Sequence, residues 1–327
     1  MADSAKTRVI DLHAHINIGA ASALMKARDT KPAKPPAPGS SGLSDKSRAP
    51  ILTQIAARLA SMDEMGVDLA VLTPSPPRGF FKADEALGVA VARATNDEVA
   101  KISADHKQRI LATGNVPLQH VAASIAELER AMSIGLKGVR IGTNIAGMEL
   151  ADSRFDPFWA RAEALGALIF LHPQGFTEPA RLEPYFLENA FGQPLETALA
   201  LAKMIFAGVF ERYPRLKIIA AHGGGFLPFY IGRFEQAWRM RPECRVNLKR
   251  SPGEVLKQIW FDTVLFRADQ VAFLVNLVGR ERVVMGTDSP FDMGENDPVG
   301  LIRKTPGLDA ATQTAILGGN AAALLGL

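Results

Sequence analysis

The sequence predicts an α/β protein, a single (β/α)8 barrel with an extended proline-rich loop after its first strand. Short apolar runs alternate with stretches of helical spacing along the whole chain. These runs are nearly continuous in apolar residues rather than alternating, which is typical of parallel strands covered on both faces. About eight such units in a chain of 327 residues favour one barrel domain over residues 1–327.

The repeating units can be placed along the chain. Strands are expected at Val9–Leu12, Asp68–Leu72, Ile110–Val116, Gly138–Ile141, Leu168–Leu171, Ile218–Ala221, Ile259–Phe261 and Val283–Met285. Helices are expected at Ile51–Met65, Asp84–His106, Val121–Ile134, Pro157–Leu165, Pro194–Phe210, Phe226–Arg239, Ala268–Val278 and Ala310–Leu317. A doubly wound open sheet is the alternative, but its first strand should lead into a glycine-rich turn. Here the first strand runs into HAH, which favours the barrel.

The segment 29–50, DTKPAKPPAPGSSGLSDKSRAP, differs from the rest of the chain in its content of Pro, Lys, Gly and Ser. Proline removes backbone donors and glycine loosens the backbone, so the segment reads as a loop insertion. It lies between the first strand and the first expected helix, which places it over the C-terminal face of a barrel, where active sites are found. A plain surface insertion is the alternative.

Composition excludes several classes of function. The formal net charge is +3, and no dense basic run with interleaved aromatic residues is present, so nucleic acid is not an expected partner. A slight positive field suits a small anionic substrate instead. No apolar run approaches the roughly 20 residues of a membrane span. The one cysteine, Cys244, and a polar N-terminal sequence lead us to expect a cytoplasmic protein.

Polar side chains stand at the ends of several expected strands. Four of the six histidines do so, in DLHAH, FLHPQG and AAHGGG, and an aspartate does so in MGTDSPF; they are His13, His15, His172, His222 and Asp288. Each of these residues alone is an ordinary polar residue at the end of a strand. In a barrel, however, they meet at one rim, and because clustering polar groups there lowers stability, the cluster indicates a functional site. Three histidines and an aspartate can hold a divalent ion, with zinc the first choice and manganese or iron possible. The remaining histidine can then move protons. A hydrogen-bonded rim without metal is the alternative.

This pattern of histidines and aspartate resembles the amidohydrolase superfamily. The stretches AHGGGFLPFYIGR, MRPEC, MGTDSPF and GNAAALLGL are similar to its decarboxylase branch, which includes 2-amino-3-carboxymuconate-6-semialdehyde, γ-resorcylate and 5-carboxyvanillate decarboxylases and some hydratases. The resemblance extends from Val9 to Leu327. It implies one metal ion, bound by His13, His15, His172 and Asp288, with His222 as the acid/base that activates a metal-bound water. No bridging carbamylated lysine is implied, since GVRIGT and IFLHPQ contain no lysine.

The resemblance also implies residues that hold the substrate. Arg48 and Arg233 match two arginines that hold a substrate carboxylate, and the second of these reaches in from a neighbouring subunit, which implies a homodimer. A plain surface helix position is the alternative for Arg233. Phe291 is expected to pack on the plane of the substrate or, equally, to fill the rim of the core. Two features depart from the family pattern: Gln174 replaces an aromatic residue, and the first loop differs strongly.

We therefore expect a metal-dependent, non-oxidative decarboxylase of a small unsaturated or aromatic carboxylic acid, with His222 or Asp288 delivering the proton. One alternative keeps the site and changes the reaction to hydrolysis or hydration of a small carboxylated ester, lactone or unsaturated acid. Another alternative is a non-catalytic barrel that serves as a scaffold.

Overall fold

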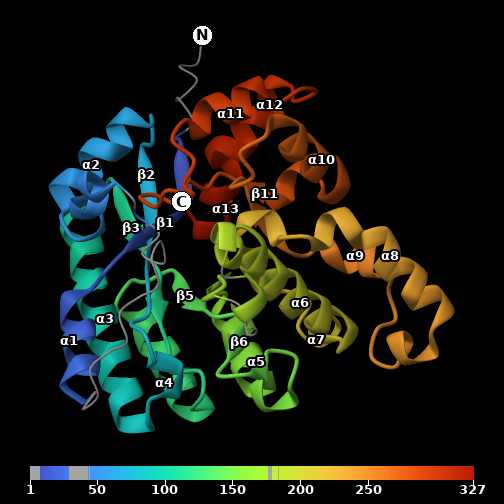
Figure 1. Ribbon diagram of the computed structural model, residues 1–327, viewed down its shortest axis with the longest axis horizontal. Helices are drawn as coiled ribbons and strands as arrows, with labels where there is room; N and C mark the ends of the chain where they lie inside the picture. Colours follow the sequence, from blue (N-terminus) through green and yellow to red (C-terminus); the bar gives the residue numbers. More distant parts are fainter. Residues whose placement is uncertain (1–7, 29–42, 44, 176–178, 183) are drawn as a thin grey trace.

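The computed structural model describes residues 8–28, 43, 45–175, 179–182 and 184–327. Strands lie at the centre of the molecule and helices cover the outside (Figure 1). The strands of the central parallel sheets are β1 Ile10–Ile16, β2 Leu69–Pro74, β3 Ile110–Ala112, β4 Gly114–Asn115, β5 Gly138–Ile141, β8 Leu168–Leu171, β9 Lys217–Ala220, β10 Trp260–Asp262 and β11 Val283–Val284. A short antiparallel hairpin, β6 Asn144–Ile145 and β7 Met148–Glu149, follows β5.

The parallel strands are hydrogen-bonded in the orders β1-β2-β3 and β11-β10-β9-β8-β5-β4. The expected strand Ile110–Val116 is divided at Thr113, because its first part pairs with β2 and its second part pairs with β5. At the other side, the Leu12 amide donates to the Met285 carbonyl at 2.9 Å, and the His15 amide donates to the Ser289 carbonyl at 2.9 Å. These bonds join β1 to the segment that begins with β11.

The helices are α1 Gly19–Arg28, α2 Ile55–Glu64, α3 Glu85–Asp105, α4 Val121–Ser133, α5 Asp156–Leu165, α6 Gln193–Phe206, α7 Val209–Arg212, α8 Leu227–Met240, α9 Pro252–Leu256, α10 Ala268–Val278, α11 Pro298–Lys304, α12 Ala310–Thr314 and α13 Asn320–Leu325. The expected helix Pro194–Phe210 is two helices, because Gly208 takes a φ of 71° between them. Helices α1, α9, α11 and α13 were not expected from the sequence. In the described part of the chain, no helix has the length and apolarity needed to cross a membrane.

The structure corrects the expected end of the proline-rich loop. Residues 29–42 and 44 lie outside the described residues. The last part of the segment belongs to a 3-10 helix, Lys46–Leu52, whose N-terminus is capped by the Asp45 carboxylate, which accepts a hydrogen bond from the Ser47 amide at 2.9 Å. Helix α2 therefore begins at Ile55 rather than at the expected Ile51.

Apolar side chains fill two zones around the strands. Outside the sheet, the helices pack against the strands over a large buried core that includes Trp159, Phe158 and Phe210. Inside it, side chains from several strands pack together with the C-terminal helix α13, and this inner cluster comprises Ile10, Leu12, Leu69, Val71, Leu168, Phe170, Ile219, Ala221, Val284, Ala321, Leu324 and Leu325. The inner cluster fills the space next to the polar residues described below.

Two local features position the polar strand ends. Strand β1 continues four residues beyond the expected Leu12, so His13 and His15 are strand residues two apart, with side chains on the same face. After β9, the chain turns sharply at His222, Gly223, Gly224 and Gly225, all with positive φ. At Gly225 a Cβ would lie 2.0 Å from the carbonyl oxygen of Pro194, so only glycine lets this turn approach the start of α6.

We predict that Gly225→Ala lowers the free energy of unfolding by about 1–3 kcal/mol, because the new Cβ meets backbone and φ is +63°. Thermal unfolding of purified protein measures the effect. Gly232→Ala on α8 is the matched control: nothing lies within 4 Å of the added Cβ, and alanine favours the helix by about 0.5–1 kcal/mol. Equal unfolding temperatures for the two variants would contradict the close approach.

Candidate metal centre

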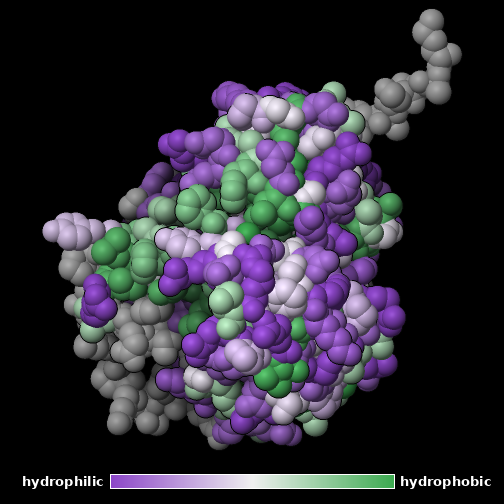
Figure 2. Space-filling view, turned by 90° about the vertical axis from the view of Figure 1, so that its right-hand side faces the viewer, coloured by the Kyte–Doolittle hydropathy of each residue, from purple (hydrophilic) through white to green (hydrophobic). Residues whose placement is uncertain are grey.

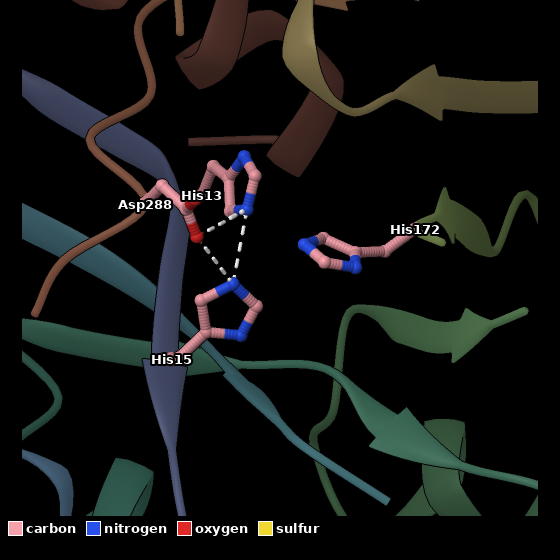
Figure 3. A group of neighbouring side chains, drawn as sticks. All are labelled: His13, His15, His172 and Asp288. Atoms are coloured by element: carbon pink, nitrogen blue, oxygen red, sulfur yellow. Dashed lines mark hydrogen bonds and ion pairs between the residues drawn. The ribbon is translucent and has the colours of Figure 1, made fainter. Parts of the chain in front are cut away.

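Four of the residues singled out in the sequence meet at one place. His13 and His15 project from β1, His172 points toward them from the end of β8, and Asp288 comes from the segment after β11 (Figure 3). Nε2 of His13 lies 3.0 Å from Nε2 of His15, and Oδ1 of Asp288 lies 3.2 Å and 2.8 Å from these two atoms. One potential ligand atom from each of the four residues lies within 4.8 Å of the others.

This arrangement fits a metal ion. A tetrahedral ion with bonds of 2.0–2.1 Å would hold its ligand atoms about 3.3 Å apart, close to the separations observed among His13, His15 and Asp288. All four residues are buried, and Nε2 of His172 has no hydrogen-bond partner among the described residues. A buried nitrogen without a partner costs free energy unless it binds something. A metal-binding site of three histidines and one aspartate is thus present.

The protonation of the four groups reflects their burial and mutual charge. Burial is the largest influence on His13 and Asp288 and disfavours their charged forms. Asp288 and Asp262 together outweigh it at His13 and raise its pKa to about 10. The interactions with His13, His15 and His222 together outweigh it at Asp288 and hold its pKa well below the usual range. Burial lowers the pKa of His15 to about 3. Burial and the charge of Arg140 lower the pKa of His172 well below its usual value. His15 and His172 are therefore neutral, as a metal ligand must be, whereas His13 has to release a proton when a metal binds.

Asp262, at the end of β10, links two parts of the site. Its Oδ2 accepts a hydrogen bond from Nδ1 of His13 at 2.6 Å and another from the His222 amide at 3.0 Å. Its Oδ1 accepts from the amides of Gly223 and Val264 at 3.0 and 3.1 Å. Burial acts most strongly and raises the pKa of Asp262, but the hydrogen bond and charge of His13, together with the hydrogen bond from the Gly223 amide, contribute to an opposite effect that outweighs it and keeps the pKa low. This buried carboxylate fixes the ring of His13, with Nε2 facing the site, and anchors the turn at His222.

Two buried arginines approach the site from other sides. Arg58 on α2 donates to the carbonyl oxygen of His15 and, at 3.0 Å, to Oγ of Ser289. Arg140 on β5 approaches Nδ1 of His172 at 2.9 Å and donates to Oγ of Ser75 at 3.2 Å. Burial lowers the pKa of Arg140 and that of Arg58 to about 10 each, so both guanidinium groups carry a positive charge at neutral pH.

His222 stands beside the four ligands but is not one of them. Its Nε2 lies 3.5 Å from Oδ2 of Asp288, and its ring centroid lies 5.0 Å from that of His172. Its Nδ1 is buried without a hydrogen-bond partner in the described structure. The side chain is 16% exposed, more than those of the neighbouring ligands, so it sits between the metal site and open space.

A cavity of about 590 Å³ opens next to His222 and Asp288. Its walls are largely apolar and aromatic, with Phe226, Phe266 and Phe273 among the lining residues. Hydrophobic side chains, green in Figure 2, also gather on the face of the molecule that carries α8. Such a cavity suits a flat apolar ligand with one polar end directed at the metal site.

The three residues expected to hold substrate lie in different surroundings. The ring of Phe291 lies 5.0 Å from that of His15, at the site. Arg48 is half-buried and donates to Oδ1 of Asn296 at 3.0 Å, and no described contact joins it to the four ligands. Arg233 is exposed on α8. The sequence thus located Phe291 at the site, whereas no described contact joins either arginine to the four ligands.

Sequence reasoning missed Asp262, Arg140 and Arg58. The first two follow the same rule that found the histidines, since WFDT and GVRIG place a charged residue at the end of a buried strand. A search of every strand end for charged residues would have found them. Arg58 carries no such signal, because arginine is common on helices and only packing shows that this one is buried.

Comparison with known proteins identifies the family of this chain. The family model described as amidohydrolase matches residues 10–327. The chain belongs to this family. A 2-amino-3-carboxymuconate-6-semialdehyde decarboxylase of Dictyostelium discoideum is 37% identical over 83% of this chain and 76% of that protein. A γ-resorcylate decarboxylase of a Rhizobium species is 27% identical over 72% of this chain and 76% of that protein.

Solved structures show the same fold. A 5-carboxyvanillate decarboxylase from Sphingomonas paucimobilis superposes with a TM-score of 0.87 at 24% identity, over 98% of this chain and 99% of that one. A dihydroxybenzoic acid decarboxylase from a Polaromonas species, solved with manganese and the inhibitor 2-nitroresorcinol, gives a TM-score of 0.83 at 25% identity, over 98% of this chain and 97% of that one.

We predict that Asp262→Asn lowers the affinity for a divalent ion by about 10–100-fold, because it removes the carboxylate that accepts the His13 N–H. Competition with a metal-binding dye measures the affinity. Asp269→Asn is the matched control, since Asp269 is exposed and pairs with Arg267 away from the site. Unchanged metal affinity in the Asp262 variant would refute its supporting role.

Proposed function

We propose that this protein is a metal-dependent, non-oxidative decarboxylase, a carboxy-lyase acting on a small aromatic or unsaturated carboxylic acid. The observation that carries the proposal is the position of His222, which lies beside a complete set of three histidines and an aspartate and lines an apolar, aromatic-walled cavity. Relatives whose chains match most of this one are named decarboxylases, which supports the same reaction.

We propose that His13, His15, His172 and Asp288 hold one divalent ion, zinc or manganese. Imidazole nitrogens and a carboxylate oxygen suit either ion, and a related dihydroxybenzoic acid decarboxylase was solved with manganese. When bound, such an ion acts as a Lewis acid that polarises the substrate and lowers the pKa of a coordinated water. A mildly positive chain and an apolar cavity favour a small carboxylate as the substrate.

The residues of this chain handle the proton and the substrate. We assign His222 as the acid/base, because Nε2 faces Asp288 and Nδ1 is free of a described partner. His222 or Asp288 delivers a proton to the carbon that bears the carboxylate, the C–C bond breaks, and its electron pair is taken by that proton as CO2 leaves. Phe291, next to His15, packs on the plane of the substrate. Arg48 and Arg233 hold its anionic end.

The reaction is tested by incubating the metal-loaded protein with ortho-hydroxybenzoates and carboxymuconate-type acids. We expect CO2 release that stops when the metal is removed by a chelator and returns when zinc or manganese is added. The matched measurement is release of acid from esters and lactones of the same compounds. If esters or lactones release acid while no carboxylic acid releases CO2, the protein is a hydrolase and not a decarboxylase.

We further propose that the protein is a homodimer in which Arg233 completes the site of the partner. Arg233 is exposed on α8, next to the exposed aromatic residues Phe229 and Tyr230, which are 74% and 52% exposed and would be covered in a dimer. Burying such a patch is a common basis of subunit association.

The shared site makes a quantitative prediction. His222→Asn and Arg233→Met should each lose activity as homodimers, whereas a refolded equimolar mixture should recover about a quarter of the wild-type rate, because half of the molecules are heterodimers with one intact site. Sedimentation confirms the dimer in each sample. A mixture no more active than its parents would place Arg233 outside the partner's site.

We also infer that the parallel strands form one closed (β/α)8 barrel in a single domain over residues 1–327. Three facts support closure: β3 and β4 are pieces of one segment, hydrogen bonds join β1 to the segment after β11, and side chains from both sheets share the inner apolar cluster. We also propose a cytoplasmic location, because a chain with a single cysteine forms no internal disulfide and suits a reducing compartment.

A further inference from the structure

Arg140 is an unusual neighbour for metal ligands. A histidine that binds a metal commonly donates its second N–H to a carboxylate or a carbonyl, as His13 does to Asp262. On the other side of the site, Nη2 of Arg140 lies 2.9 Å from Nδ1 of His172, and Nη1 lies 3.4 Å from Nδ1 of His15. A guanidinium group has only donors, so it cannot accept the N–H of a metal-bound imidazole.

The hydrogen bonds of His172 show a competition. Nδ1 of His172 lies 2.9 Å from Arg140 and 2.7 Å from the carbonyl oxygen of Pro173. If Nδ1 accepts from Arg140, the proton of the neutral ring sits on Nε2, the atom that faces the other ligands. If Nε2 is to bind a metal, Nδ1 must instead carry the proton and donate it to Pro173. The bond from Arg140 therefore favours the form of His172 that cannot bind metal.

Metal binding would remove hydrogen-bond acceptors from the guanidinium of Arg140. Once Nδ1 of His172 and Nδ1 of His15 carry protons, the remaining described acceptor is Oγ of Ser75, at 3.2 Å from Nη1. Nε of Arg140 is already buried without a partner, and no carboxylate among the described residues forms an ion pair with this side chain, which is 4% exposed. A buried guanidinium in this state is stabilised by an anion nearby.

The surrounding charges point the same way. Within the described structure, the buried charged side chains at the site are three carboxylates, one of them the ligand Asp288, and two guanidinium groups; these are Asp11, Asp262, Asp288, Arg58 and Arg140. A divalent ion added to this set leaves one net positive charge, which one anionic ligand neutralises. Without Arg140, the same site with its metal would be neutral and would have no such preference.

We propose that Arg140 is a specificity-determining residue, whose guanidinium makes the metal-loaded site favour anionic ligands over neutral ones while opposing metal binding by the free protein. The inference rests on the metal site of the proposed function and deepens it. It accounts for selection of a carboxylate or phenolate by a charge inside the chain, before Arg48 or a partner subunit contributes.

The test uses the Co²⁺-loaded protein, whose visible spectrum reports ligands at the metal. Azide is the anionic probe and imidazole is the neutral one. For Arg140→Met we expect azide affinity to fall about tenfold, the effect of a unit charge several ångströms away in a partly buried site, with little change for imidazole. Arg140→Lys keeps the charge and should keep the preference for azide. Thermal unfolding checks that each variant is folded.

Metal affinity gives an independent readout with a distinctive sign. Because Arg140 opposes metal binding, Arg140→Met should bind Co²⁺ at least as tightly as the wild type, whereas Asp262→Asn should bind it more weakly. Weaker Co²⁺ binding by Arg140→Met, or an equal loss of azide and imidazole binding, would reduce Arg140 to a structural role and overturn the proposal. A wild-type protein that binds no Co²⁺ would overturn the metal site and this inference together.

Discussion

The site depends on the buried carboxylate of Asp262, which satisfies four donors from three parts of the chain. It holds the imidazole of His13 on β1, the amides of His222 and Gly223 in the turn after β9, and the amide of Val264 just after its own strand. A charge buried this deeply is stable only with such a set of hydrogen bonds. The same carboxylate bonds both His13 and the backbone of His222, so it ties the position of a metal ligand to that of the proposed acid/base.

The environment of the ligands is asymmetric in charge. Behind His13 stands a carboxylate, which increases the basicity of the ring and favours metal binding. Behind His15 and His172 stands a guanidinium, which has the opposite effect. An arrangement of this kind gives up some metal affinity and gains a site that attracts anions. Such a site would suit a substrate that arrives as an anion and a product, CO2, that leaves without charge.

The cavity beside the metal site offers an apolar surface for a ligand. Aromatic side chains from α8 and from the segment leading into α10 line it, and His222 and Asp288 bring the metal site to its wall. Apolar walls favour a flat unsaturated ring and keep water away from the reacting carbon. The exposed aromatic residues on α8 continue this apolar surface toward the outside, which is why the proposed dimer and the proposed substrate site involve the same helix.

The sequence by itself determined the order of strands and helices, the five polar strand ends and the nature of the metal ligands. It could do so because buried parallel strands leave continuous apolar runs, and His and Asp at their ends stand out against them. Tertiary structure decided the division of the strand at Thr113, the helix 19–28, and the supporting charges of Arg58, Arg140 and Asp262. Those features depend on which groups meet after folding. The local sequence does not distinguish a buried arginine from an exposed one, because burial arises from contacts between distant segments.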